Sequence, residues 1–229
     1  MNTLQKLLLA TGNPGKLREL RARMAQTPIE ILGLADLTPR PDEVPETGDT
    51  FAANAVLKAV GYGQIAQMPT LADDSGLCVH ALDNAPGVYS ARFAGPQATD
   101  ALNNQLLLEK LAQTPDDQRT AHFHCALALY IPPGPLAADL AHKAPDHITV
   151  TALDGLPPPT NPAQNGAVFI THGQTHGRIL HAPQGDGGFG YDPLFLSDDL
   201  GISFAQAHDT KKSVSHRARA LREIVDFIS

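Results

Sequence analysis

The stretch ATGNPGKLREL, residues 10–20, follows an apolar run and has the composition of an anion-binding turn. A strand-to-helix turn presents backbone N–H groups and the positive end of a helix dipole, and Lys16 would add a full charge. It is not a P-loop, because its glycines are closer together and Leu17 replaces the metal-binding hydroxyl. Asn-Pro-Gly is also an ordinary turn sequence. The candidate anion-binding residues are Thr11, Gly12, Asn13, Pro14, Gly15 and Lys16.

Two further stretches supply carboxylates that suit a hard cation such as Mg²⁺. Glu46 precedes a predicted helix, and Asp73 and Asp74 end a predicted strand. Because consecutive strand residues point to opposite faces, one aspartate should face a site while the other serves the turn. Taken alone, Asp-Asp-Ser-Gly is typical of a polar turn. Lys58 could reach the same place, although most such lysines are merely solvated.

The stretch GDGGFGYDP and the later KKSVSHR combine glycines, aromatic rings and cations. The glycines would let the backbone approach a flat ligand, and Phe189 or Tyr191 offers a ring for stacking on a base. Lys212 could add positive charge near phosphates, and His216 and Arg217 would supply hydrogen-bond donors. A glycine-rich loop with buried aromatic side chains is the alternative interpretation.

Composition limits the class of protein. The 229 residues fit one domain or two lobes that share a sheet, and 42% hydrophobic with 18% charged residues is typical of a soluble globular protein. A net charge of −7 argues against a non-specific nucleic-acid binder. No apolar run approaches the ~18 residues of a membrane span, and no signal peptide is expected. With only Cys78 and Cys125, we expect a reducing cytoplasm and core thiols.

The elements that must position these residues alternate between strands and helices. We expect helices over 16–24 and 50–67, a helix capped by Thr99, and a final helix over 213–228. The predicted strands are 4–10, TLADDSGLCV with a break at Asp-Ser-Gly, HFHCALALYI and GAVFITHG. This order predicts an α/β protein with a mixed sheet, in a single two-lobed domain over residues 1–229.

The segment 131–165 departs from that rhythm, because it holds eight of the nineteen prolines. Such a density of proline prevents regular helix and disfavours central strands. A short strand-like stretch, HITVTAL, lies between its proline clusters. We interpret the segment as an inserted hairpin or flap that projects from the sheet; a disordered linker is the competing interpretation.

Six stretches in one order resemble the inosine triphosphate pyrophosphatase family, which hydrolyses non-standard purine nucleoside triphosphates such as ITP, dITP and XTP. They are TGNPGK, ETGDTFAANAVLKA, ADDSGL, APGVYSARFAG, FGYDPLF and KKSVSHR, and they extend over nearly the whole chain. The proline-rich segment is longer than is usual in that family, and a tryptophan common near HGQTHG is absent.

The resemblance implies an elongated mixed β-sheet with flanking helices, two lobes around a central active-site cleft, and a homodimer. It implies Asp74 as the catalytic carboxylate and a Mg²⁺ ligand, and Glu46 as the second ligand. The phosphate contacts would be Lys16, Lys58 and Lys212. The residues that would hold the nucleoside are Ser75, Phe189, Gly190, Tyr191, Asp192, His216 and Arg217. His208 and Lys211 fall in the most variable part of the last motif and receive no role.

Charge indicates how such a site would work, because a triphosphate carries about four negative charges. Magnesium and lysines must neutralise them before Asp74 can orient a water for in-line attack on the α-phosphorus. A nucleotide-sensing module without turnover is one rival, and it would need the lysines but not the paired carboxylates. A zinc hydrolase is another, suggested by His122 and His124 with His172, His176 and His181, although no third ligand stands at a familiar spacing.

Overall fold

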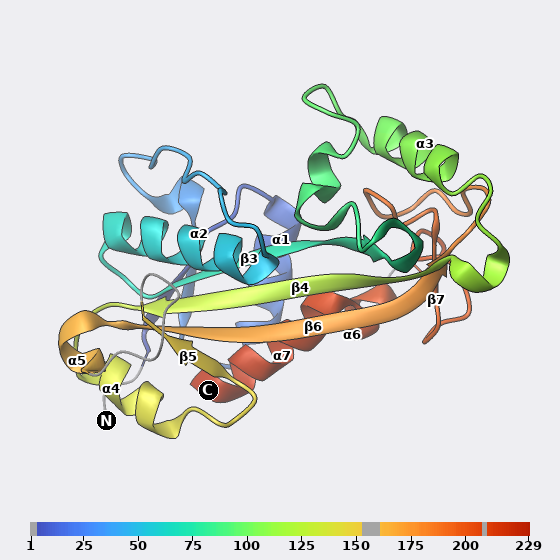
Figure 1. The fold of residues 1–229 in the computed structure, drawn as a ribbon. Coiled ribbons are helices and arrows are strands. Elements are labelled where there is room, and N and C mark those ends of the chain that lie inside the picture. The colour runs from blue at the N-terminus through green and yellow to red at the C-terminus, as the bar shows by residue number, and fades with distance from the viewer. Residues whose placement is uncertain (1–3, 153–160, 208–209) are drawn as a thin grey trace. The chain divides into compact units, whose positions relative to one another are not determined.

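The computed structural model describes residues 4–152, 161–207 and 210–229 (Figure 1). Its contacts divide the chain into two compact units. Unit 1 comprises Met1–Asp74, Ala126–Thr171 and Ala220–Ser229, and unit 2 comprises Ser75–Cys125 and His172–Arg219. The strands β3 (Thr70–Val79), β4 (Thr120–Ile131) and β6 (Ala167–Ile179) and the helix α7 (His216–Ile228) contribute residues to both units.

The sheet is mixed, as the sequence predicted. In unit 1, β1 (Lys6–Leu9) pairs in parallel with β2 (Glu30–Gly33) and with β3. The strand order is β2-β1-β3-β4-β6-β5, and β5 (Thr149–Thr151) is antiparallel to β6. Strands β1 and β3 are apolar where they pair, since Leu9 lies opposite Leu71 and both are buried. Because β1 ends at Leu9, opposite Leu71, the residues that follow β1 lie beside the middle of β3, where Asp73 and Asp74 stand.

Two helices of unit 1 begin at residues whose side chains cap them. In α1 (Pro14–Met24), the Asn13 side chain accepts hydrogen bonds from the first backbone amides. In α2 (Phe51–Ala66), the Thr50 hydroxyl accepts from the amide of Ala53, and Gln67 ends the helix in a left-handed conformation. Both helices lie where the periodicity predicted them. A short 3₁₀ helix, η1 (Leu34–Asp36), follows β2.

The proline-rich segment contains regular structure. Helix α4 (Pro135–Lys143) begins at a proline, and α4 packs against the short helix α5 (Pro162–Asn165). The prediction that prolines exclude helix here is wrong, because a proline at the first helical position loses no intrahelical hydrogen bond. Strand β5 extends the sheet as its last strand, so this part of the segment is not a projecting flap. Residues 153–160, with their three consecutive prolines, lie outside the described residues.

Unit 2 is built around one apolar cluster. Its elements include the 3₁₀ helices η2 (His80–Leu82), η3 (Gly87–Arg92) and η4 (Asp116–Gln118), the helix α3 (Asp100–Lys110), the strand β7 (Phe195–Ser197) and the short helix α6 (Lys211–Val214). Thr99 caps α3 as predicted. Strand β7 pairs antiparallel with β6. The buried cluster comprises Leu77, Val79, Leu107, Leu111, Ala121, Phe123, Ile179, Tyr191, Leu194, Phe195 and Phe204.

Two expected boundaries differ from the structure. Strand β3 continues without a break through Asp-Ser-Gly, because these residues keep an extended backbone within the ladder. The last helix, expected over 213–228, is divided into α6 and α7, because Ser215 between them has an extended backbone with a ψ of 151°. Within the described ranges, none of the helices combines the length and the apolar character needed to cross a membrane.

Candidate active site

Lys16 and Asp73 form a buried ion pair in unit 1. The Lys16 Nζ lies 2.9 Å from Oδ1 and 2.7 Å from Oδ2 of Asp73, and the Asp73 residue is only 4% exposed. Lys16 comes from the first turn of α1, and Asp73 comes from β3, beside the end of β1. The expectation that Asp73 merely serves a turn is therefore wrong, because its carboxylate holds the predicted phosphate-binding lysine.

A second cluster of unit 1 surrounds Asp74. The Lys58 Nζ lies 3.2 Å from Oε2 of Glu46 and 3.9 Å from Oδ1 of Asp74. The amide of Asn54 donates to Oδ2 of Asp74 at 3.0 Å, and its own carbonyl oxygen accepts from the backbone amide of Gly48 at 2.7 Å. Asn54, which is 1% exposed, thus joins the loop that carries Glu46 to the aspartate.

The charges around Asp74 compete. Burial raises the pKa of the Asp74 carboxyl above its ordinary value, while Lys58 and the hydrogen bond from Asn54 act in the opposite direction. The nearby carboxylates of Glu46 and Asp73 raise the pKa further. A partly buried carboxylate whose pKa is raised is better suited to accept a proton than an ordinary surface aspartate.

The turn before α1 uses part of its hydrogen-bonding capacity internally. Oδ1 of Asn13 accepts from the amides of Gly15 at 2.8 Å and Lys16 at 3.4 Å, and the Asn13 amide donates to the Thr11 hydroxyl at 3.2 Å. Thr11, Gly12, Asn13, Pro14 and Gly15 therefore form a capped turn. Any anion at this turn would be met mainly by Lys16 and by the dipole of α1.

The donor set fits magnesium. Oxygens of Glu46 and Asp74 both face the ammonium of Lys58, so the two carboxylates are directed at a common point. Mg²⁺ in proteins is usually held by one or two carboxylates together with phosphate oxygens and water. Among the described residues, no group of three or more His, Cys, Asp or Glu side chains could hold a metal ion by itself.

Unit 2 contains a pocket that brings together most of the residues predicted to bind a nucleoside. Its lining includes Ser75, Phe189, Gly190, Tyr191, Asp192, His216 and Arg217. The ring of Phe189 is 59% exposed, whereas Tyr191 is buried and its hydroxyl donates to the Ser90 carbonyl at 2.9 Å. Burial raises the pKa of the Tyr191 phenol, which keeps it neutral.

The donors in this pocket are held in place. Nη2 of Arg217 donates to the Ser75 hydroxyl at 3.0 Å. The His216 ring stacks on Phe123, with centroids 4.9 Å apart and planes inclined by 14°. Ser75 is the next residue in the chain after Asp74, so the strand β3 carries both the candidate catalytic carboxylate and a residue of the pocket.

Lys211, which received no role from the sequence, lines the pocket. Its Nζ forms an ion pair with the buried carboxylate of Asp192 and lies 5.0 Å from the ring centroid of Phe189. The side chain of Lys212 lies outside what the structure describes, so its phosphate role stays a prediction. Residue type alone cannot distinguish between two neighbouring lysines on a short helix. The ion pair with the buried Asp192 is what identifies Lys211 as the lysine of the pocket.

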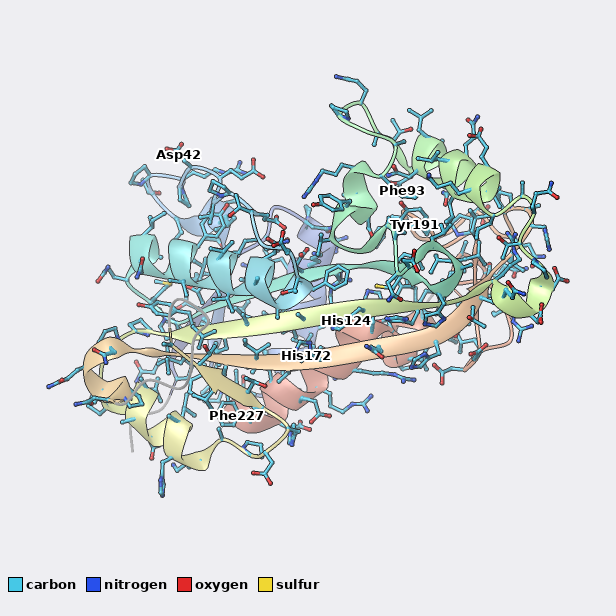
Figure 2. All side chains as sticks on the ribbon, viewed as in Figure 1. Asp42, Phe93, His124, His172, Tyr191 and Phe227 are labelled. Carbon is cyan, nitrogen blue, oxygen red and sulfur yellow. The ribbon has the colours of Figure 1, made fainter. Side chains whose placement is uncertain are left out.

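The histidines gather elsewhere in unit 2. His124 and His172, labelled in Figure 2 on the neighbouring strands β4 and β6, have Nε2 and Nδ1 3.1 Å apart. The His122 ring centroid lies 5.3 Å from that of His80 and 5.8 Å from that of His176. The zinc hydrolase interpretation finds no set of three ligands in the described ranges.

These features define an α/β protein whose two units carry complementary groups. Unit 1 offers a lysine and carboxylate cluster that suits phosphates and a cation. Unit 2 offers an aromatic pocket with hydrogen-bond donors that suits a ring. Together they define the class of proteins that bind phosphorylated ligands containing an aromatic base.

Comparison with known proteins identifies the family. The model of the Ham1 family matches residues 7–227. The chain is 40% identical to a dITP/XTP pyrophosphatase of Pectobacterium atrosepticum and 39% identical to that of Escherichia coli K12, in each case over 98% of both chains.

Solved structures agree. A HAM1 protein from Coxiella burnetii superposes with a TM-score of 0.77 at 33% identity, covering 97% of this chain and 98% of that one. A dITP/XTP pyrophosphatase from Mycobacterium abscessus gives a TM-score of 0.70 at 36% identity, covering 96% and 98%. The chain belongs to the Ham1 family, and the resemblance inferred from six sequence motifs is confirmed.

Proposed function

We propose that this protein hydrolyses ITP, dITP and XTP to the nucleoside monophosphate and pyrophosphate, and so removes non-standard purines from the nucleotide pool. The single observation that carries the proposal is the cluster around Asp74, in which Lys58 and Asn54 contact this partly buried carboxylate and Lys58 also contacts Glu46. In a cluster of this kind, the lysine can bind a phosphate oxygen and the carboxylate can accept a hydrogen bond from a water molecule. The relatives named dITP/XTP pyrophosphatases, aligned over nearly the whole chain, support the substrate class.

The reaction needs a base and a set of cations. Asp74 accepts a proton from the attacking water and orients it toward the α-phosphorus, for which its raised pKa is suited. Lys58 balances the charge of Asp74 and Glu46 before substrate arrives, and its ammonium can turn to a phosphate oxygen afterwards. Lys16 can exchange the carboxylate of Asp73 for a phosphate in the same way. No covalent intermediate is required.

Magnesium is the metal that we propose, with Glu46 and Asp74 as its protein ligands. When bound, Mg²⁺ supplies charge neutralisation for the phosphates and for the departing pyrophosphate. Lys58 contacts the same two carboxylates, so its ammonium would stand beside the phosphates of a substrate held there. The residues of the chain do the positioning: Asn54 holds Asp74, and the Gly48 amide holds Asn54.

Base choice is assigned to the pocket of unit 2. A 6-keto purine presents an acceptor where adenine presents an amino donor, so the donors of His216 and Arg217 favour ITP and XTP over ATP. Phe189 provides the stacking ring, and Lys211 provides a cation beside it. Equal catalytic efficiency on ATP and ITP would remove this assignment.

Analysis of the products tests the proposal. With Mg²⁺ present, ITP should yield IMP and pyrophosphate in equal amounts, with little orthophosphate, and omission of the metal should abolish turnover. IDP with orthophosphate would contradict attack at the α-phosphorus. Binding of ITP without any turnover would instead support the nucleotide-sensing alternative, which the carboxylates Glu46 and Asp74 argue against.

Two further proposals concern the protein in the cell. We expect it to act as a homodimer, which sedimentation of the purified chain would test. We also expect it to work in the cytoplasm, because its nucleotide substrates are found there and its two cysteines are buried thiols. It needs no nucleic-acid or membrane partner for this reaction.

A further inference from the structure

Helix α3, labelled in Figure 1, reaches the loop that carries Phe189 through two side chains. Oδ2 of Asp100 accepts a hydrogen bond from the Gly190 amide at 2.6 Å, and Nδ2 of Asn104 donates to the Gly190 carbonyl at 2.9 Å. Residues four apart lie on the same face of a helix. One face of α3 therefore fixes both backbone polar groups of Gly190.

The loop is held on the other side of Phe189 as well. The Phe189 amide donates to Oδ2 of Asp192 at 2.9 Å, and Gly188 and Gly190 have φ angles of +75° and +61°, which favour glycine. The backbone on both sides of Phe189 is thus fixed, yet its ring is 59% exposed. An exposed ring on a fixed backbone is a preorganised surface for stacking, since little entropy is lost when a base binds.

The same helix also fixes a second part of the pocket lining, at Ser90 and Ala91. Asn103 donates through Nδ2 to the carbonyls of Ser90 at 3.3 Å and Ala91 at 3.2 Å. Its Oδ1 accepts from the Ala94 amide at 2.8 Å, and the residue is 3% exposed. Ser90 and Ala91 line the pocket together with Phe189 and Gly190. Adjacent asparagines of α3 therefore hold two parts of the pocket lining.

Asn104 is not explained by fold stability alone. Its Oδ1 is buried and has no hydrogen-bond partner among the described residues. A buried polar atom without a partner destabilises the folded state, so an apolar side chain would serve better if packing were its only task. The contact of Nδ2 with Gly190 gives a reason for an asparagine at this position.

We propose that Asp100 and Asn104 are positioning residues for base recognition, which hold Gly190 so that Phe189 presents its ring to the purine. The inference rests on the proposed function, because it takes the pocket of unit 2 as the nucleoside site. Asn104 is not among the residues that line the pocket, whereas Asp100 is; both bind the Gly190 backbone and act through it on Phe189.

Binding of IMP, measured by titration calorimetry, tests this role without any hydrolysis. Asn104→Ala and Asp100→Ala should each weaken IMP binding about fivefold to tenfold, a part of what a lost base stack costs. Asp100→Asn keeps an oxygen that accepts from the Gly190 amide but removes the charge at the start of α3, so it should bind IMP nearly as tightly as the wild type. Gln105→Ala is the matched control, since the exposed Gln105 side chain donates to Oε1 of Glu109 at 2.9 Å and is not among the residues that line the pocket.

A double-mutant cycle with Phe189→Ala separates positioning from general loosening of the fold. If Asn104 acts through the ring, Asn104→Ala should change IMP affinity less than twofold in the Phe189→Ala background. Fully additive losses would overturn the inference, and so would unchanged IMP affinity in Asn104→Ala, or equal losses in Asp100→Asn and Asp100→Ala. Failure of the wild-type protein to bind IMP would be a different result, because it would contradict the proposed function itself.

Discussion

The lysine and carboxylate cluster of unit 1 and the pocket of unit 2 are built from different kinds of contact. In the cluster, charged side chains hold one another, as Lys16 holds Asp73 and Lys58 holds Glu46. The pocket also contains an ion pair, Lys211 with Asp192, but the loop that carries Phe189 is held by side chains that bind its backbone, as Asp100 and Asn104 hold Gly190. A charge cluster can exchange partners when a charged ligand arrives, whereas a backbone held by side chains keeps its shape.

This difference separates the two tasks of the proposed enzyme. Phosphates and a metal require charges that are balanced before binding and available after it, which mutual ion pairs provide. Recognition of a flat base requires a surface that is already in place, which the fixed loop provides. Substitutions in the cluster should therefore change the chemical step, and substitutions in the pocket should change affinity.

The largest effect is expected at Asp74. Asp74→Asn keeps the shape of the side chain but removes the charge that we propose binds metal and accepts a proton, so pyrophosphate release from ITP should fall by roughly two orders of magnitude or more. Melting temperature should be unchanged or slightly higher, because a carboxylate is removed from a site that contains two others. An active Asp74→Asn variant would contradict the carboxylate mechanism.

The second largest effect is expected at Phe189, in the pocket of unit 2. Phe189→Ala removes an exposed ring, so the KM for ITP should rise about tenfold while kcat changes by less than about threefold. Melting temperature should not fall, since the ring is 59% exposed. A large loss of kcat with an unchanged KM would show that the pocket takes part in the chemical step, and the division of tasks would fail.

The third prediction concerns Asp73, beside Asp74 in β3. Asp73→Asn leaves the Lys16 ammonium without its carboxylate, so the variant should melt several degrees lower and lose far less activity than Asp74→Asn. Both variants should be compared for melting temperature and pyrophosphate release in one experiment. A folded but inactive Asp73→Asn, together with an active Asp74→Asn, would reverse the assignment of the two aspartates.

Much of unit 1 could be predicted from local sequence signals. Asn13 before α1 and Thr50 before α2 are capping residues followed by periodic apolar positions, so both helices were found. The partners of Asp73 and Asp74 were harder to predict, because they depend on which residues the sheet order brings beside β3. Alternation predicted that the two aspartates have different surroundings, and they do have different partners, but it could not show that Asp73 meets Lys16.

Unit 2 shows what remains hidden from the sequence. The rings and donors of its pocket were predicted, yet the role of α3 was not, because Asp100 and Asn104 bind backbone atoms almost ninety residues later in the chain. Backbone contacts of this kind leave no pattern of residue types. Helix α4 could not be predicted from the density of proline, because Pro135 stands at the start of the helix, where a proline is tolerated.

The smallest effect on activity is expected from His124, which is not among the residues that line the pocket. Burial, together with His172 and His122, lowers the pKa of His124 to about 4 from an ordinary value of 6.5. Between pH 6.5 and pH 4 the unfolded chain takes up a proton at this ring that the folded chain does not, so the stability that the neutral ring contributes is lost as the pH falls.

His124→Gln cannot titrate, so the drop in its melting temperature between pH 7.5 and pH 5 should be smaller than in the wild type. Activity on ITP at pH 7.5 should stay within about twofold, because no charge in the cluster changes. An unchanged acid sensitivity would contradict the lowered pKa of the half-buried His124, and a large loss of activity at pH 7.5 would show that titratable groups of unit 2 matter to the chemistry as those of unit 1 do.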